Sequence, residues 1–71
     1  MQRKIIKAKL DDYSLTQTWL INQLSKRGII TERSEFSAIL SGTRTGNKVE
    51  EVIKTSLEIL DAYEKNFEKP N

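Results

Sequence analysis

The feature that most constrains this sequence is a series of positions, mostly apolar, that recurs every three or four residues through its last third. The series consists of Val49, Val52, Ile53, Ser56, Leu57, Leu60, Tyr63 and Phe67. This spacing follows the 3.6-residue period of an α-helix and predicts one long helix over about residues 48–67, ended by Pro70. The chain has 71 residues, enough for at most one domain whose core is small relative to its surface.

Three shorter apolar stripes precede this helix. The stripe at residues 5–10 predicts a helix over about residues 2–12. The stripe at residues 20–24 predicts a second helix that ends near Arg27, and the stripe at residues 36–40 predicts a third. The stripes consist of Ile5, Ile6 and Leu10; Leu20, Ile21 and Leu24; and Phe36, Ile39 and Leu40.

Residues suited to helix ends flank the second and third stripes. Thr16 and Thr31 are N-cap candidates, because a threonine hydroxyl can accept a hydrogen bond from an orphan backbone N–H. Glu32 then falls in a first turn, where a carboxylate favours the positive end of the helix. Gly28 and Gly42 suit the left-handed residue that closes a helix.

The segments between the stripes are short. Ile29 and Ile30 are too few for a convincing strand, and we expect them to fill the core between two helices. Residues 41–47 form a loop by composition. We therefore predict an all-α fold, a compact domain of four to five helices over residues 1–71 with its core at about residues 3–60.

The chain contains no Cys and no His. Disulfides and Cys–His metal sites are therefore excluded, and we expect no metal or other cofactor. Small cores often need additional stabilisation from disulfides, metals or a partner subunit. With the first two excluded, association into a homodimer is the remaining source of stabilisation. We expect no catalysis, because the pairs Asp11–Asp12 and Glu50–Glu51 are adjacent residues that point in different directions on a helix.

The net charge of +2 is unevenly distributed. Residues 1–9 carry +4 and residues 43–48 carry +2, whereas residues 49–71 carry −3. Such polarity can orient a protein on a polyanion. No apolar run approaches the ~20 residues that cross a bilayer, and Lys7 and Lys9 interrupt the N-terminus before any secretory segment. We therefore expect no membrane association and a cytoplasmic location.

Two short motifs carry a resemblance to a known family. They are Leu15-Thr16-Gln17 and the run Leu40-Ser41-Gly42-Thr43-Arg44-Thr45, with Leu20, Leu24, Phe36 and Ile39 between them. Over about residues 3–60 the chain resembles the DNA-binding domain of lambda-type phage repressors and Cro proteins. In size and in its basic start it is similar to small regulators in the lysogeny switches of Gram-positive phages, which would place it in the cytoplasm of a bacterial host.

The resemblance implies a lambda-repressor-like helix-turn-helix fold and a double-stranded DNA operator as partner. The second and third helices would form the helix-turn-helix, and the third would lie in the major groove. Two features differ from the family pattern: Ile21 stands where a small residue is usual, and the connection at residues 25–30 exceeds the usual turn. The two differences agree with each other. A bulkier residue between the two helices forces them to cross farther apart, and a longer connection is then needed to join them.

The resemblance also assigns phosphate contacts. Gln17 would approach a phosphate at the start of the second helix. The loop after the third helix would grip the DNA backbone through Thr43, Arg44, Thr45, Asn47 and Lys48. The alternative is a polar loop with two ordinary surface cations. Arg3, Lys4 and Lys7 could reach an adjoining phosphate, although basic N-termini are common.

The third helix offers side chains that could read bases. Arg can pair with guanine, Glu can accept from cytosine, and Ser can contact several bases. Two Glu and one Arg, however, make this helix net negative, whereas a helix that reads the major groove must approach negatively charged phosphates. The alternative is that these residues only cap the helix and form its solvated face. The base-reading candidates are Glu32, Arg33, Ser34, Ser37 and Ala38.

Aromatic residues outside the stripes suggest a second class of function. Trp19 is either an anchor for a partner or the edge of the core, folded over Tyr13 or Leu10. Tyr63 and Phe67 would be dimer contacts. The alternative to direct DNA binding is thus a modulator or antirepressor that binds a phage repressor protein. Its candidate contacts are Trp19, Glu32, Glu35, Tyr63 and Phe67.

Overall fold

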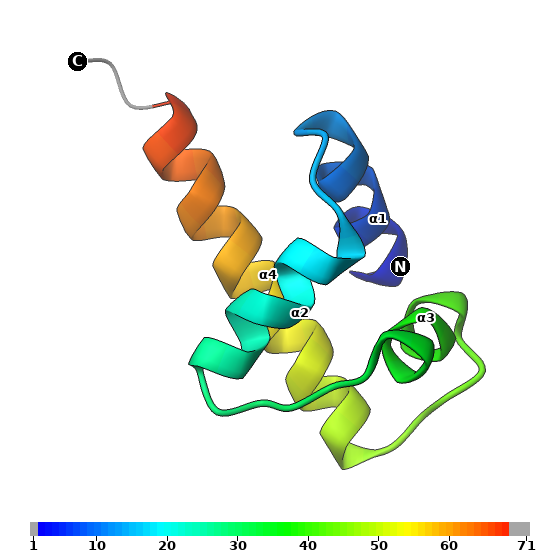
Figure 1. Cartoon of the computed structure of the whole chain (residues 1–71). Coiled ribbons are helices and arrows are strands. Elements are labelled where there is room, and N and C mark those ends of the chain that lie inside the picture. Colours follow the sequence, from blue (N-terminus) through cyan, green and yellow to red (C-terminus); the bar gives the residue numbers. More distant parts are fainter. Residues whose placement is uncertain (1, 69–71) are drawn as a thin grey trace.

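The computed structural model describes the backbone of residues 2–68 and the side chains of residues 3–66. Within this range the chain forms four α-helices and no strand, so the predicted all-α class is confirmed. The helices are α1 (Gln2–Asp12), α2 (Gln17–Lys26), α3 (Arg33–Ser41) and α4 (Asn47–Glu68) (Figure 1). Asn47, expected in the loop, is the first residue of α4, while Pro70 lies outside the described residues.

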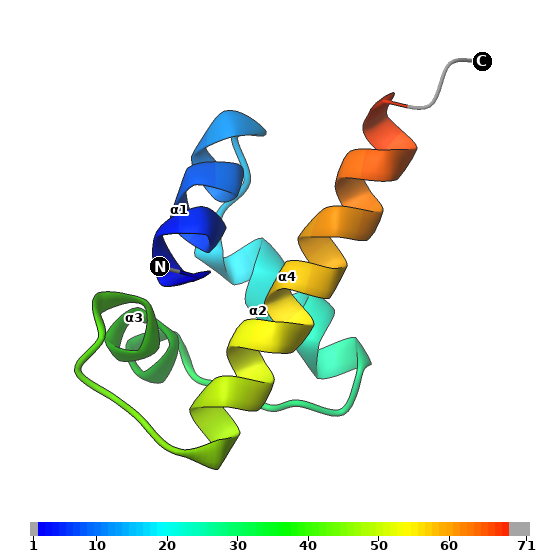
Figure 2. The ribbon, with the colours of Figure 1, turned by 180° about the vertical axis from the view of Figure 1, so that it is seen from behind.

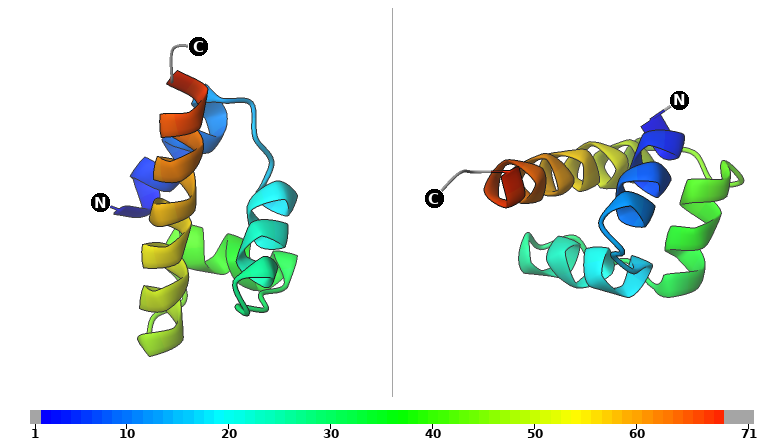
Figure 3. Two further views of the ribbon diagram at one scale, coloured as in Figure 1. Left: turned by 90° about the vertical axis from the view of Figure 1, so that its left-hand side faces the viewer. Right: turned by 90° about the horizontal axis from the view of Figure 1, so that it is seen from above.

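The long helix α4 is the element along which the others assemble. Helices α1 and α2 each contact both α3 and α4, which closes the helices around one core. Seen from behind and from the side, the C-terminal end of α4 reaches beyond α2 (Figures 2 and 3). Among the described residues no helix combines the length and the apolarity needed to cross a bilayer.

The core is built mostly from the predicted stripes, with Ile59 added, a residue that the predicted stripes did not include. Its buried apolar members are Ile6, Leu10, Leu20, Leu24, Phe36, Ile39, Leu40, Val49, Val52, Ile53, Ile59 and Leu60. Ile5 is an exception, because its side chain is 45% exposed. On α1 the core-facing side is formed by Ile6 and Leu10, four residues apart, and Ile5 lies beside it on a more exposed part of the helix. Ile21 is half-buried and packs against the core.

The ends of the helices follow local rules. The Thr16 hydroxyl accepts a hydrogen bond from the Trp19 backbone N–H at 3.0 Å, which confirms the N-cap of α2. Gly28 and Gly42 follow α2 and α3 with φ of 85° and 88°, the left-handed conformation expected of them. Helix α1 is followed by the same conformation at Ser14, whose φ is 56°.

The connection between α2 and α3 departs from prediction at two residues. Thr31 is not an N-cap: Glu32 occupies that position without a side-chain cap, and the buried Thr31 hydroxyl has no partner among the described residues. Ile29 packs against the core as expected, whereas Ile30 is 67% exposed. Ile29 and Thr31 both face inward, whereas Ile30 between them faces solvent.

Candidate nucleic-acid interface

A hydrogen bond joins the start of α2 to the outer face of α3. Gln17, the first residue of α2, is half-buried, and its Oε1 accepts a hydrogen bond from Ser37 Oγ at 3.1 Å. The backbone N–H groups of the first helical turn lie beside this bond, and they favour anions. The predicted phosphate contact and one predicted base reader thus lie side by side.

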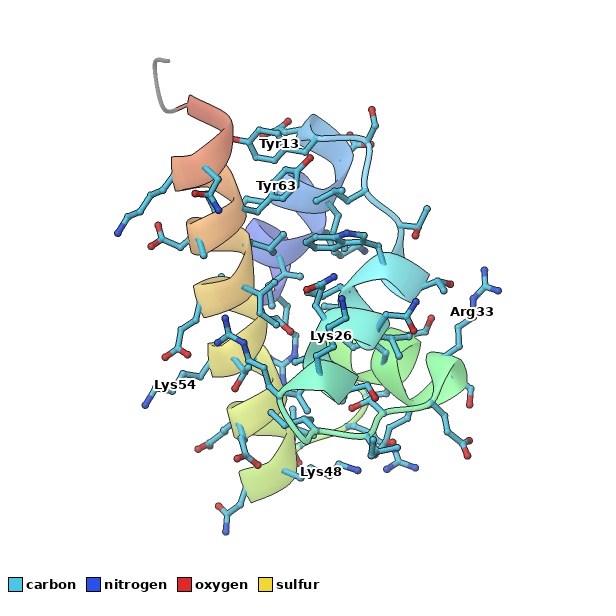
Figure 4. The ribbon with its side chains drawn as sticks, turned by 60° about the vertical axis from the view of Figure 1, so that its left-hand side comes forward. Tyr13, Lys26, Arg33, Lys48, Lys54 and Tyr63 are labelled. Carbon is cyan, nitrogen blue, oxygen red and sulfur yellow. The ribbon has the colours of Figure 1, made fainter. Side chains whose placement is uncertain are left out.

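Three of the other base-reading candidates lie at or just before the start of α3, and the fourth, Ala38, lies in its second half. Glu32, Arg33 and Ser34 are exposed, and Ala38 is half-buried. Arg33 extends away from the body of the molecule (Figure 4). A cation in the first turn of a helix is unfavourable to the helix dipole, so Arg33 is not placed there for helix stability.

The loop after α3 is held by hydroxyl groups. Thr43 Oγ1 donates a hydrogen bond to the Ala38 carbonyl at 3.0 Å, and Ser41 Oγ donates to the same carbonyl at 3.1 Å. The Thr43 hydroxyl is therefore engaged in a hydrogen bond that helps to end α3. Thr45 and Asn47 are exposed, with no side-chain hydrogen bond within the described part of the chain.

The two cations of this loop region converge on one carboxylate. Arg44 Nη1 and Lys48 Nζ lie 3.3 Å and 3.4 Å from the same oxygen, Oε2 of Glu35. Glu35, one of the two carboxylates counted in the predicted third helix, is thus matched by the cations predicted to grip DNA. Glu35 is also in the first turn of α3, where the helix dipole favours a negative charge.

Arg3 has a structural role that sequence reasoning missed. Its Nε donates a 2.7 Å hydrogen bond to the Ile39 carbonyl in the last turn of α3, and one terminal nitrogen lies 3.5 Å from the Arg44 carbonyl. Helix α3 has no basic residue in its own last turn. Arg3 supplies that charge from α1 and is less available for a phosphate than the exposed Lys4 and Lys7.

An aromatic cluster joins the C-terminal half of α4 to α2 and to the turn that follows α1. Trp19 packs edge-on against Tyr63 with ring centroids 5.4 Å apart, and Tyr13 packs against the same ring at 5.5 Å. Figure 4 shows Tyr13 and Tyr63 together beside α4. Trp19 therefore lies at the edge of the core, where it packs on Tyr63. Tyr63, predicted as a dimer contact, makes contacts within its own chain. The Phe67 side chain lies outside the described residues.

An ion pair next to this cluster joins α1 to α4. Lys9 Nζ lies 2.8 Å from Glu64 Oε1, and the Tyr13 hydroxyl donates to Glu64 Oε2 at 2.9 Å. Hydrogen bonds from Lys9 and then Tyr13 lower the pKa of Glu64 below its ordinary value. The hydrogen bond to Glu64 likewise raises the pKa of Lys9.

A groove of about 560 Å³ lies between the connection after α2 and the first half of α4. Arg27 and Lys48 line it together with Glu51 and Glu58, and Arg27 pairs with Glu58 at 3.5 Å. Charges of both signs are mixed in this groove, so its charge does not favour a polyanion.

Comparison with models of known protein families, with characterised proteins and with solved structures gives no match to this chain. The assignment of a function therefore depends on the residues and their geometry.

Proposed function

We propose that this chain is a small Cro-like DNA-binding transcription regulator of a phage or prophage genetic switch. In this proposal α2 and α3 form a helix-turn-helix, and α3 enters the major groove of a double-stranded operator. The observation that carries it is the 3.1 Å hydrogen bond from Ser37 to Gln17. It aligns the anion-favouring start of α2 with the exposed side of α3, as simultaneous phosphate and base contacts require.

Base reading falls to the exposed residues at the start of α3. Arg33 can donate two hydrogen bonds to guanine, and Glu32 can accept one from cytosine. Ser34 and Ser37 carry hydroxyls that suit several bases. The half-buried Ala38 offers only a small apolar contact.

Phosphate contacts fall to the residues that flank this face. Gln17 contributes with the start of α2, while Arg44 and Lys48 supply charge from the loop and the start of α4. Thr45 and Asn47 are exposed and can add neutral hydrogen bonds. As a homodimer, the protein would place two copies of α3 about 34–36 Å apart on a palindromic operator.

The alternative, a modulator that binds a phage repressor, loses two of its supports. Trp19 packs on Tyr63 within the chain, so it is not a fully free anchor. Glu35 pairs with Arg44 and Lys48 and is not free to bind the cations of a repressor. Glu32 alone stays exposed among the acidic candidates, and direct DNA binding is the better-supported function.

The test is a fluorescence-anisotropy titration of the protein with its own promoter region and with a scrambled duplex, over a range of salt. We expect tighter binding to the promoter and a steep loss of affinity with salt. Arg44→Ala should weaken binding to both duplexes and flatten the log–log salt slope by about one unit. Arg33→Ala should instead reduce the preference for the promoter by ~1–3 kcal/mol at one base pair.

The control is Lys54→Ala, which removes the same charge from the middle of α4. Lys54 and Arg33 extend from opposite sides of the molecule (Figure 4), so the control should bind DNA as the wild type does. Equal affinity for promoter and scrambled DNA would contradict an operator-binding function. Binding to the promoter only when the neighbouring repressor is present would favour the modulator.

A further inference from the structure

The Glu35 carboxylate lies between Arg44 and Lys48, although a site that only binds phosphates would not need a negative charge there. Glu35 comes from the first turn of α3, Arg44 from the loop and Lys48 from the first turn of α4. Both cations bind the same oxygen, at 3.3 Å and 3.4 Å. The fold thus places one negative charge against the two positive charges that would hold the DNA backbone.

The three side chains differ in exposure. Only 18% of the Glu35 side chain is exposed, compared with 58% of Arg44 and 54% of Lys48. The carboxylate is therefore mostly shielded from solvent, whereas more than half of each cationic side chain faces solvent. A phosphate that arrives from solvent meets Arg44 and Lys48 while their charge is partly neutralised by this carboxylate.

We propose that Glu35 is a built-in counter-charge, which occupies these cations as a phosphate oxygen would and weakens their hold on nucleic-acid phosphates. This inference rests on the proposed DNA-binding function and adds a regulation of the same site. Carboxylate and phosphate oxygens both accept charge-assisted hydrogen bonds from Arg and Lys, so the two compete for the same donors. Because binding to arbitrary sequences depends on phosphate electrostatics, Glu35 sets how tightly the protein holds such DNA.

The chain offers a matched control for removing this charge. Glu50 lies in the first turn of α4, as Glu35 does in α3, so both carboxylates interact with a helix dipole. Within the described residues Glu50 is exposed and forms no ion pair. Glu35→Gln and Glu50→Gln therefore change the net charge equally, and only the first releases Arg44 and Lys48.

The experiment measures binding of both variants and the wild type to an arbitrary 20-base-pair duplex and to heparin, a polysulfate. We expect Glu35→Gln to bind the duplex about three- to tenfold more tightly than Glu50→Gln, with a salt slope steeper by about one unit. It should also elute from heparin at higher salt. In the double variant Glu35→Gln with Arg44→Gln, most of this gain should disappear. Circular dichroism checks that each variant is folded.

Each outcome has a distinct meaning. Equal binding by Glu35→Gln and Glu50→Gln overturns the inference. Weaker binding by folded Glu35→Gln also overturns it, because the carboxylate would then position the cations for the phosphate. If the expected difference appears on heparin while no form binds the duplex, the proposed DNA-binding function fails and the counter-charge stands. Failure to bind either polyanion overturns both.

Discussion

Trp19 packs edge-on against Tyr63, with ring centroids 5.4 Å apart and ring planes inclined by 72°. The two residues are far apart in the sequence, and their contact joins α2 to the C-terminal half of α4. Edge-to-face aromatic pairs add to the stabilisation that comes from burial alone. This contact is one of the attachments of the C-terminal half of α4 to the rest of the domain.

The first prediction concerns this contact. Trp19→Ala should lower the free energy of unfolding by about 2–3 kcal/mol, because the half-buried indole and its pairing with Tyr63 are both lost. Trp19→Phe keeps an aromatic ring and should cost less. Thermal denaturation followed by circular dichroism measures both variants. An unchanged melting temperature for Trp19→Ala, together with weaker binding to a repressor, would restore Trp19 as a partner anchor.

The second prediction concerns the core. Leu24 and Ile39 are both fully buried, so replacing either with Ala should cost ~2–5 kcal/mol through lost burial and the cavity left behind. In a domain this small, such a loss would largely unfold the protein. Ile30→Ala is the control, because Ile30 is 67% exposed and should change the stability by less than about 0.5 kcal/mol. Urea unfolding gives the comparison, and similar midpoints for all three variants would refute this description of the core.

The third prediction concerns a buried hydroxyl. Ser56 is fully buried on α4, and its Oγ has no hydrogen-bond partner among the described residues. Ser56→Ala should therefore stabilise the protein by about 1 kcal/mol, because the cost of an unsatisfied polar group disappears. Thr31→Val tests the same idea at the buried Thr31 hydroxyl. Calorimetric melting measures both, and a lower melting temperature for Ser56→Ala would indicate a partner for the hydroxyl in solution.

The fourth prediction concerns acid stability. Hydrogen bonds from Lys9 and Tyr13 lower the pKa of Glu64 in the folded state. The resulting stabilisation is complete above the ordinary Glu pKa of about 4.3 and is lost as the pH falls through the lowered folded value. Relative to Glu64→Gln, the wild type should thus have its full advantage at neutral pH and lose it in acid. Chemical unfolding of both proteins at several pH values measures the difference in their free energies of unfolding. A difference that grows in acid would contradict the lowered pKa of Glu64.

Much of the fold could be predicted from the sequence. The periodic spacing of apolar residues located all four described helices and most of the core, because a helix places residues three or four apart on one face. Thr16, Gly28 and Gly42 marked helix ends correctly, since capping depends on a few neighbouring residues. Ser14 adopts the left-handed conformation without being a glycine, and its type alone did not indicate this.

The candidate site was only partly predictable. Sequence reasoning named Gln17, Ser37, Arg44 and Lys48 separately, but not the hydrogen bond and ion pairs that join them to each other or to Glu35.

The tertiary structure alone decided which residues distant in the sequence meet. Arg3 bonds to the end of α3, Trp19 packs on Tyr63, and Glu35 holds two cations from other elements. Helix periodicity and capping act within one or two turns, so the sequence by itself determined the helices and their buried faces. Contacts between helices depend on how those faces pack together, and a single side chain such as Arg3 can reach several positions until packing selects one.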